Sequence, residues 1–464
     1  MRGAAIAGAS GVAVKALGAA LRIPLIALIG CYGLGLYQKT YAFYAFAVTL
    51  CSAGIPSALS KQTAEARVDR MGGQSPFRAY LRLFLLVGAC GGALVAAIPI
   101  AYGARGNAAA AYAVLAPAVP LACVASTLCG DFQGRENLLP PAVSEVAAQA
   151  VKIVFSLLFC LTLRNDAGRA VTALCLAATL SVGAECATLL CFKKKRRHAE
   201  KPLLCAPDYR EYGVKRIMSF TLPVMLSAAV LPFTGYIESL LLPRLFGAYV
   251  ADATALYGLF AGAAASISHL PATLCRGVAA AAIPDLSAEV KRNGVAACGK
   301  KIAYACFLNV AVALPACACL FAFSPLAVKL LFSSLAPQEQ AMLTECIRIA
   351  SPGVLFYSLA QTLSACLTAL NQPKTAAACW GTACLFRLLL DVLLAGAAKF
   401  SVNGAAIAEV GGYFLAFFLI LLYNLSVIRR EKRGAANQAQ SVKALRKGAA
   451  AFFPARRKIR GKQA

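Results

Sequence analysis

The chain has 464 residues, of which 60% are hydrophobic and only 14% charged, which excludes a soluble globular protein and indicates a polytopic membrane protein. The net charge is +27, but no nucleic-acid-binding motif accompanies it, so nucleic acid is not an expected partner. We attribute the surplus to basic loops that stay on the inner side of a membrane.

The first predicted span covers residues 4–29 and carries two basic side chains. Lys15 and Arg22 are seven residues apart, so a helix places them on nearly the same face. A charge at the bilayer centre costs roughly 2.5–3.5 kcal/mol and usually faces a bundle interior or a wet cavity. We therefore predict a cationic stripe directed into the protein. The segment lacks a convincing cleavage site, so we expect a retained helix rather than a signal peptide.

Apolar segments of spanning length recur along the chain, and each is long enough to cross a bilayer, which needs about 20 residues. The predicted fold is therefore an all-α bundle of about twelve transmembrane helices, at residues 4–29, 41–60, 80–103, 110–130, 140–163, 170–192, 216–243, 253–284, 302–331, 342–370, 374–398 and 402–428.

A basic loop divides these helices into six and six. The loop covers residues 193–215 and separates a first lobe, 1–192, from a second lobe, 216–428. The remaining residues, 429–464, form a basic tail that we expect to be unstructured and to lie against anionic lipid headgroups.

The two lobes contain similar segments at similar places. GIPSALS ends the second predicted helix and AIPDLS ends the eighth, and their prolines are offset by 228 positions. Paired six-helix halves are common in transporters, which place the binding site between the halves. If the halves rock about a central cavity, these segments approach and separate at the cytoplasmic side. The predicted gate residues are Pro56, Ser57, Pro284 and Asp285.

The sequence offers no enzyme site. It has no Walker A motif and no evident nucleophile–base set, and its 19 cysteines are scattered without metal-ligand spacing. We expect no catalytic residues, no cofactor and no metal.

Ionisable residues inside the apolar spans are the remaining candidates for function. Lys15, Arg22 and Arg276 have no acid near them in the sequence, and together with Lys152 they are the predicted anion-binding residues. A second set is a possible ion site or structural pair. Within it, Arg387 and Asp391 are one helical turn apart and are predicted to neutralise each other, and Glu238 is the third member.

Two blocks of sequence resemble a known family. The first contains RIP from Arg22, GLGLYQ from Gly33 and AGIP from Ala53, and the second begins with FQG at Phe132 and continues to Lys152. Both resemble the stage V sporulation protein B group of polysaccharide-biosynthesis, oligosaccharide-flippase proteins. That group belongs to the superfamily that also holds MurJ lipid II flippases, Wzx flippases and MATE drug exporters.

This resemblance implies a function and a location. It implies two lobes around a central cavity and alternating access that carries a lipid-linked oligosaccharide to the outer leaflet. The implied cargo is a peptidoglycan precursor on an undecaprenyl carrier, in the plasma membrane of a bacterial cell. The expected partners are this anionic lipid and the membrane lipids, and we expect a monomer. Arg and Lys suit a diphosphate, because Arg can bind it through two parallel hydrogen bonds.

Other functions stay open at this point. A flippase for another polysaccharide precursor would need the same cations. A MATE-type multidrug or cation antiporter would instead favour carboxylates in its cavity, and the first lobe offers mainly cations. Some MurJ relatives bind sodium among helices seven, eleven and twelve, but Arg387 places a fixed cation beside Asp391. A structural membrane scaffold would leave the cationic stripe unexplained.

The distribution of basic residues predicts the topology. With both termini inside, the inner loops and tail hold 33 of the 46 Lys and Arg residues, the outer loops hold 6, and 7 lie within spans. Reporter fusions after Gly73, Lys195 and Gly434 should therefore be cytoplasmic, and fusions after Gly106 and Gly168 should be external. An external reporter after Lys195 would contradict the twelve-helix topology.

Overall fold

The computed structural model describes residues 2–68, 76–101, 103–164, 166–199, 214–272, 275, 286, 289–290, 292, 294–370 and 372–452. Every regular element in these ranges is a helix, which confirms the predicted all-α class.

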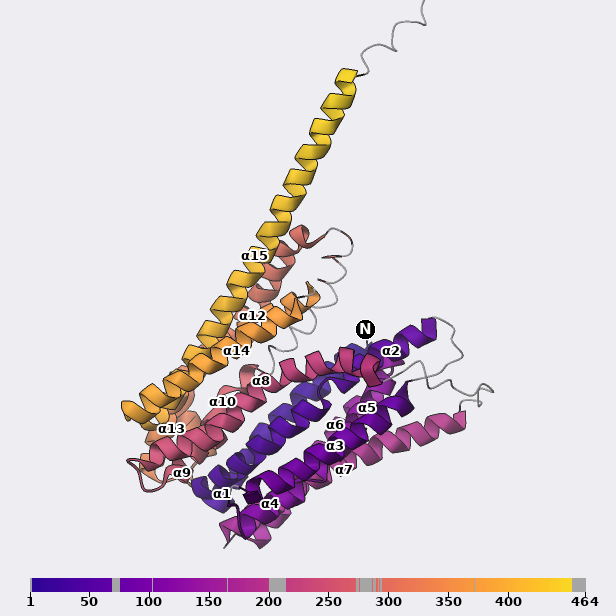
Figure 1. Ribbon diagram of the computed structural model, residues 1–464. Coiled ribbons are helices and arrows are strands. Elements are labelled where there is room, and N and C mark those ends of the chain that lie inside the picture. Colours follow the sequence, from indigo (N-terminus) through magenta and orange to yellow (C-terminus); the bar gives the residue numbers. More distant parts are fainter. Residues whose placement is uncertain are drawn as a thin grey trace, which may run out of the picture.

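The first element, α1 (Arg2–Ser52), is a hairpin of two helices. Gly30 interrupts it with φ 69° and ψ 176°, a backbone conformation that glycine adopts without steric cost. Figure 1 shows the N-terminus and α2 (Ile55–Val68) at the same end of the bundle, so the chain reverses within α1. The second span was predicted to begin at residue 41, and the structure corrects this, because residues 31–40 are already helical.

The rest of the first lobe consists of five helices. The single predicted span 110–130 is divided into two of these helices. Pro117 stands at the division, because proline lacks the backbone N–H that would continue the helical hydrogen-bond ladder. The five are α3 (Phe77–Ala101), α4 (Asn107–Leu115), α5 (Ala118–Gly134), α6 (Leu139–Thr162) and α7 (Ala167–Ala199).

The second lobe begins with the long helix α8 (Val214–Gly247) and contains two π-helical segments. Its other elements are α9 (Ala253–Tyr257), the π-helix η2 (Gly258–Ala264), α10 (Ala265–Ser268), η3 (Val295–Cys298), α12 (Gly299–Leu331), α13 (Pro337–Ala369), α14 (Pro373–Leu390), the π-helix η4 (Asp391–Ala397) and α15 (Ser401–Phe452).

The last helix corrects the prediction for the tail. α15 continues past residue 428 to Phe452 and extends beyond the rest of the bundle (Figure 1). The part after 428 is rich in Ala, Lys, Arg and Gln, which are good helix formers, so local propensity supports the helix where the tail was predicted to be unstructured.

Among the described residues, nine segments are long and apolar enough to span a membrane. One of them, Ser10–Ala64, contains the hairpin at Gly30 and therefore crosses twice. The more polar α13 has 33 residues, which is also a spanning length. With the partly described segment after Ala253, this arrangement is consistent with twelve helices.

The two lobes touch through bare backbone near the Gly30 turn. An ideal Cβ at Gly258 of η2 would overlap the carbonyl oxygen of Cys31, and one at Gly35 would overlap the carbonyl oxygen of Thr254. A side chain at Gly262 would likewise overlap Leu34. Glycine is needed at these positions because any larger residue would push the helices apart.

The predicted gate is only partly described. Pro56 and Ser57 lie in the first turn of α2, and Pro56 packs on Gly130 of α5. Pro284 and Asp285 lie outside the described residues. The gate therefore stays a prediction.

The glycine contact between the lobes can be tested by adding one methyl group. Gly258→Ala should lower the free energy of unfolding by about 1–3 kcal/mol, because the new Cβ meets backbone that cannot yield easily. Gly381→Ala in α14 is the matched control, since nothing lies within 4 Å of its Cβ position and alanine favours helix by roughly 0.5–1 kcal/mol. Thermal unfolding in detergent measures both. Equal stability of the two variants would contradict the close packing.

Candidate functional site

A cavity of about 320 Å³ lies where the first helix of α1 meets α6 and the second lobe. We call it the cationic chamber, because Arg22 and Lys152 both line it. Its other lining residues are Val14, Gly18, Ala19, Leu21, Leu25, Tyr37, Gln38, Tyr41, Gln149, Ser156, Ala265, Ser266, His269 and Leu270.

Arg22 connects the two lobes inside this chamber. Its Nη1 donates to the carbonyl oxygen of Gly262 at 3.4 Å and to the hydroxyl of Ser266. Gln38 makes a parallel connection, since its Nε2 donates to the carbonyl oxygen of Ala261 at 2.7 Å. Both acceptor carbonyls belong to η2, and π-helical turns frequently occur at functional sites.

Two further groups in the chamber have spare binding capacity. Lys152 Nζ lies 4.8 Å from the centroid of the Tyr41 ring and also makes a side-chain hydrogen bond with Tyr41. A lysine ammonium has three N–H donors, so this contact does not use all of them. Gln149 Nε2 is buried without a hydrogen-bond partner and faces Gly18 across the gap between α1 and α6. A buried donor without a partner costs about 1–3 kcal/mol, so a ligand that accepts from it would be favoured.

The chamber contains no counter-charge among its lining residues in the described part of the chain, since none is Asp or Glu. Its charged groups are a guanidinium and an ammonium, and Gln149 adds an amide N–H without a partner. Such a set recognises an anion with several acceptor oxygens.

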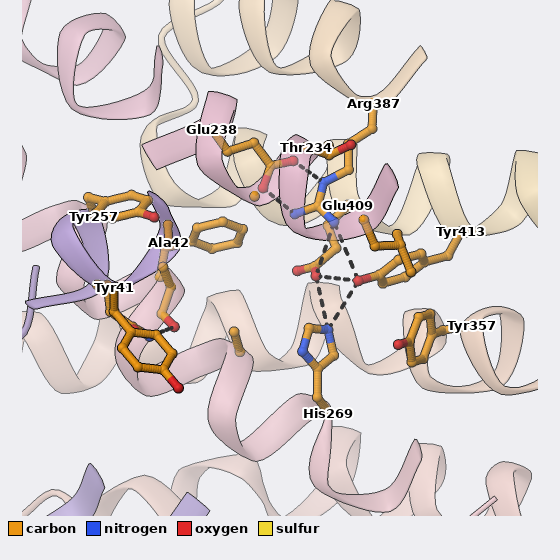
Figure 2. Close-up of a pocket in the computed structure, with 16 residues that line it drawn as sticks. Tyr41, Ala42, Thr234, Glu238, Tyr257, His269, Tyr357, Arg387, Glu409 and Tyr413 are labelled. Atoms are coloured by element: carbon orange, nitrogen blue, oxygen red, sulfur yellow. Dashed lines mark hydrogen bonds and ion pairs between the residues drawn. The ribbon is translucent and has the colours of Figure 1, made fainter. Parts of the chain in front are cut away.

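A second cavity of about 250 Å³ adjoins the first, and the two share Gln38, Tyr41, Ala265 and His269. We call it the acid–base chamber, because Glu238, Glu409 and Arg387 line it. Figure 2 shows the side chains of these three residues pointing toward one another. Tyr413 and His269 lie next to Glu409, and Tyr357 lies next to Tyr413.

The charges of the acid–base chamber are paired with each other. Arg387 forms a two-point ion pair with Glu238, in which Nη2 donates to Oε2 at 2.8 Å. Its Nη1 lies 3.5 Å from Oε1 of Glu409. The same Glu409 oxygen accepts from the Tyr413 hydroxyl at 2.9 Å and lies 3.0 Å from His269 Nε2. These groups form one network across α8, α14, α15 and the segment after α10.

This network corrects the predicted Arg387–Asp391 pair. The ion pairs of the guanidinium are with Glu238 on α8 and Glu409 on α15. Asp391 is 1% exposed and opens the π-helix η4, and its Oδ2 has no hydrogen-bond partner.

The predicted anion-binding residues are brought together in part. Arg22 and Lys152, from different helices, line one chamber. The side chain of Lys15 and the whole of Arg276 lie outside the described residues.

Sequence reasoning missed several side chains that line the two chambers. His269 lines both chambers, and Tyr413 and Gln149 were not singled out from the sequence. The signal available in the sequence was Glu409, an isolated acid in an apolar span. In the described part of the chain, no group of three His, Cys, Asp or Glu residues could hold a metal ion, and the cysteines are free.

Comparisons with known proteins agree with this architecture. Residues 1–290 match the family model described as polysaccharide biosynthesis protein. Stage V sporulation protein B of Bacillus subtilis (strain 168) is 26% identical over 438 residues, covering 90% of this chain and 82% of that protein.

Two solved structures share the fold. One is the inward-facing conformation of a multidrug resistance MATE family transporter of the MOP superfamily, with a TM-score of 0.69, 17% identity and coverage of 93% of this chain and 99% of that one. The other is the lipid II flippase MurJ in an inward closed conformation, with a TM-score of 0.66, 13% identity and coverage of 90% and 85%. At these identities the likeness establishes the fold alone, an all-α bundle like that of these two structures.

The acid–base network makes a prediction about stability. Arg387→Met should lower the free energy of unfolding by about 3–5 kcal/mol, because it leaves Glu238 and Glu409 buried beside each other without a cation. Adding Glu238→Gln should recover part of the loss. Arg244→Met, at the exposed end of α8, is the matched control and should be nearly neutral. An Arg387→Met protein with the wild-type unfolding temperature would show that the network does not stabilise the lobe.

Proposed function

The chain belongs to the polysaccharide biosynthesis protein family, and from this premise we propose that it transports a lipid-linked oligosaccharide from the inner to the outer leaflet of a bacterial plasma membrane. The observation that carries the proposal is the cationic chamber. A diphosphate bears several acceptor oxygens and more than one negative charge, and Arg22, Lys152 and Gln149 supply donors without a competing carboxylate.

The position of Arg22 suggests how binding could be coupled to movement. Arg22 lies on the first helix of one lobe and donates to Gly262 and Ser266 of the other. A diphosphate would exchange these neutral acceptors for charged ones, which form stronger hydrogen bonds with a guanidinium. Substrate binding would thus loosen one connection between the lobes, as alternating access requires. An inside-negative membrane would add about 2.3 kcal/mol per negative charge per 100 mV of outward movement.

For the cargo we propose a peptidoglycan precursor on an undecaprenyl carrier. The support is the likeness to stage V sporulation protein B and the fold shared with a lipid II flippase. A precursor of another polysaccharide would present the same diphosphate and is the alternative that fits the chamber equally. Rescue of a bacterial strain depleted of its lipid II flippase tests the peptidoglycan cargo directly, and failure of rescue by an abundant protein would favour the alternative.

A MATE-type cation antiporter is the rival from another substrate class. The carboxylates of the acid–base chamber are what it would use, and the fold is shared. Glu238 and Glu409 are, however, already engaged by Arg387. Increased resistance to cationic dyes in a drug-sensitive strain, together with failure of rescue, would favour the antiporter.

The transport proposal predicts which arginine is needed. Arg22→Ala should reduce rescue activity by about tenfold or more at near-normal membrane abundance, because a charge-assisted hydrogen bond contributes roughly 1.5–3 kcal/mol. Lys15→Ala should be less severe, and Arg22→Lys should retain part of the activity, since it keeps the charge but loses the two-point geometry. Arg348→Gln in α13, an exposed arginine that lines neither chamber, is the matched control. Wild-type transport by Arg22→Ala would remove Arg22 from the site.

A further inference from the structure

His269 is a titratable side chain of the second lobe that lines both chambers. It stands at the C-cap of α10, where its backbone N–H donates to the carbonyl oxygen of Ala265 at 3.0 Å. Ser266, which accepts from Arg22, lies three residues earlier and therefore on the same side of this helical turn. The side chain of His269 is 40% exposed, so the ring borders open space rather than packed core.

The partners of one ring nitrogen determine where its hydrogen lies. Nε2 of His269 is 3.0 Å from Oε1 of Glu409 and 3.2 Å from the hydroxyl oxygen of Tyr413. An ionised carboxylate can only accept, and the Tyr413 hydroxyl already donates its hydrogen to Glu409. Both neighbours of Nε2 are therefore acceptors, so Nε2 carries a hydrogen whether the ring is neutral or charged.

The other ring nitrogen, Nδ1, is available to a ligand. It forms no hydrogen bond with any residue in the described part of the chain. Figure 2 shows this nitrogen on the side of Tyr41 and away from Tyr357. Tyr41 lines both chambers, and its ring contacts the ammonium of Lys152. Nδ1 therefore faces the side of the cavity on which a cation of the first lobe lies.

One proton reverses what Nδ1 offers to an anion. In the neutral ring with its hydrogen on Nε2, Nδ1 carries a lone pair and can only accept a hydrogen bond, which an anionic oxygen cannot supply. In the imidazolium form Nδ1 donates, and the ring carries a positive charge. Histidine is the side chain whose charge ordinarily changes between about pH 5 and 8.

We propose that His269 is a ligand from the second lobe to the transported anion and binds it only in the protonated form, an inference that rests on the proposed function. The diphosphate then lies between Arg22 and Lys152 of the first lobe and His269 of the second. Charge-assisted hydrogen bonds from both lobes hold it across the interface. Because the protonated ring binds the anion and the neutral ring does not, affinity rises as the pH falls.

Other ionisable groups surround the ring and must be separated from it in any test. The charged and titratable groups that face His269 come from α1, α6, α8, α13, α14 and α15, and they are Arg22, Tyr41, Lys152, Glu238, Tyr357, Arg387, Glu409 and Tyr413. A carboxylate among them that took up a proton would also alter anion binding. The experiment therefore compares the wild type with variants that lack only the imidazole.

The pH dependence of anion binding tests this inference. The probe is undecaprenyl diphospho-N-acetylglucosamine, and its binding is measured to the purified full-length protein in nanodiscs of zwitterionic lipid. Its diphosphate is esterified at both ends, so it lacks the terminal phosphate that would itself take up a proton near about pH 6. The wild type should bind it about tenfold more tightly at about pH 5.5 than at about pH 8, because a hydrogen bond to a charged group contributes at least that much.

Two variants and a control assign the effect to the ring. His269→Gln should bind with one affinity at both pH values, close to that of the wild type at the higher pH. Its amide still donates to Glu409 from the position of Nε2 but takes up no proton. His269→Asn, whose amide lies near the position of Nδ1 instead, should likewise show no pH dependence. His198→Gln, near the end of α7, changes the other of the two histidines and should keep the wild-type pH dependence.

The outcomes separate the two proposals. If the wild type binds the probe at neither pH, the proposed function fails, and this inference with it. If the wild type binds equally at both pH values, or if His269→Gln keeps the pH dependence, His269 is not the ligand while the proposed function stands. Loss of binding at both pH values by variants that keep the wild-type unfolding temperature would also overturn the inference, because the ring would then shape the chamber rather than change its charge.

Discussion

The contact between the two lobes depends on the hydrogen bonds that the Arg22 guanidinium makes. Arg22 lies within an apolar span, where an unsolvated charge would be costly, so its helix must face polar groups. The groups it finds are a carbonyl and a hydroxyl of the other lobe rather than a carboxylate. Neutral partners satisfy hydrogen bonds but leave the positive charge uncompensated. The chamber around it is consequently both a contact between lobes and an electrostatically favourable place for an anion.

The two chambers differ because the lobes handle charge differently. In the second lobe, Arg387 is surrounded by Glu238 and Glu409, and the network is closed on itself. Such a network resists opening, since removal of any member leaves another charge buried. In the first lobe, Arg22 and Lys152 share a cavity with no acid among its described lining residues. The first lobe is thus suited to binding, and the second to holding its helices in register.

Packing at the lobe contact makes this arrangement possible. Gly35 and Gly258 let two backbones approach closely, as small residues do between membrane helices. That approach brings η2 within reach of Arg22 and Gln38. A bulkier residue at either glycine would move the acceptor carbonyls away from both side chains. The cationic chamber and the interface between the lobes are therefore built from the same few residues.

The sequence by itself determined the all-α class, the positions of most spans and the isolation of cations in the first lobe, because hydropathy and charge are local properties of the chain. It also indicated that Arg22 faces inward. Only the tertiary structure decided which charges meet. Arg387 was predicted to pair with Asp391, one turn away, yet its partner Glu238 is 149 residues distant in the chain. Helix spacing limits which neighbours on one helix can touch, whereas contacts between helices depend on packing that no local pattern records. The same reason explains why Gln149 and His269 were recognised as lining the cationic chamber only when their helices came together.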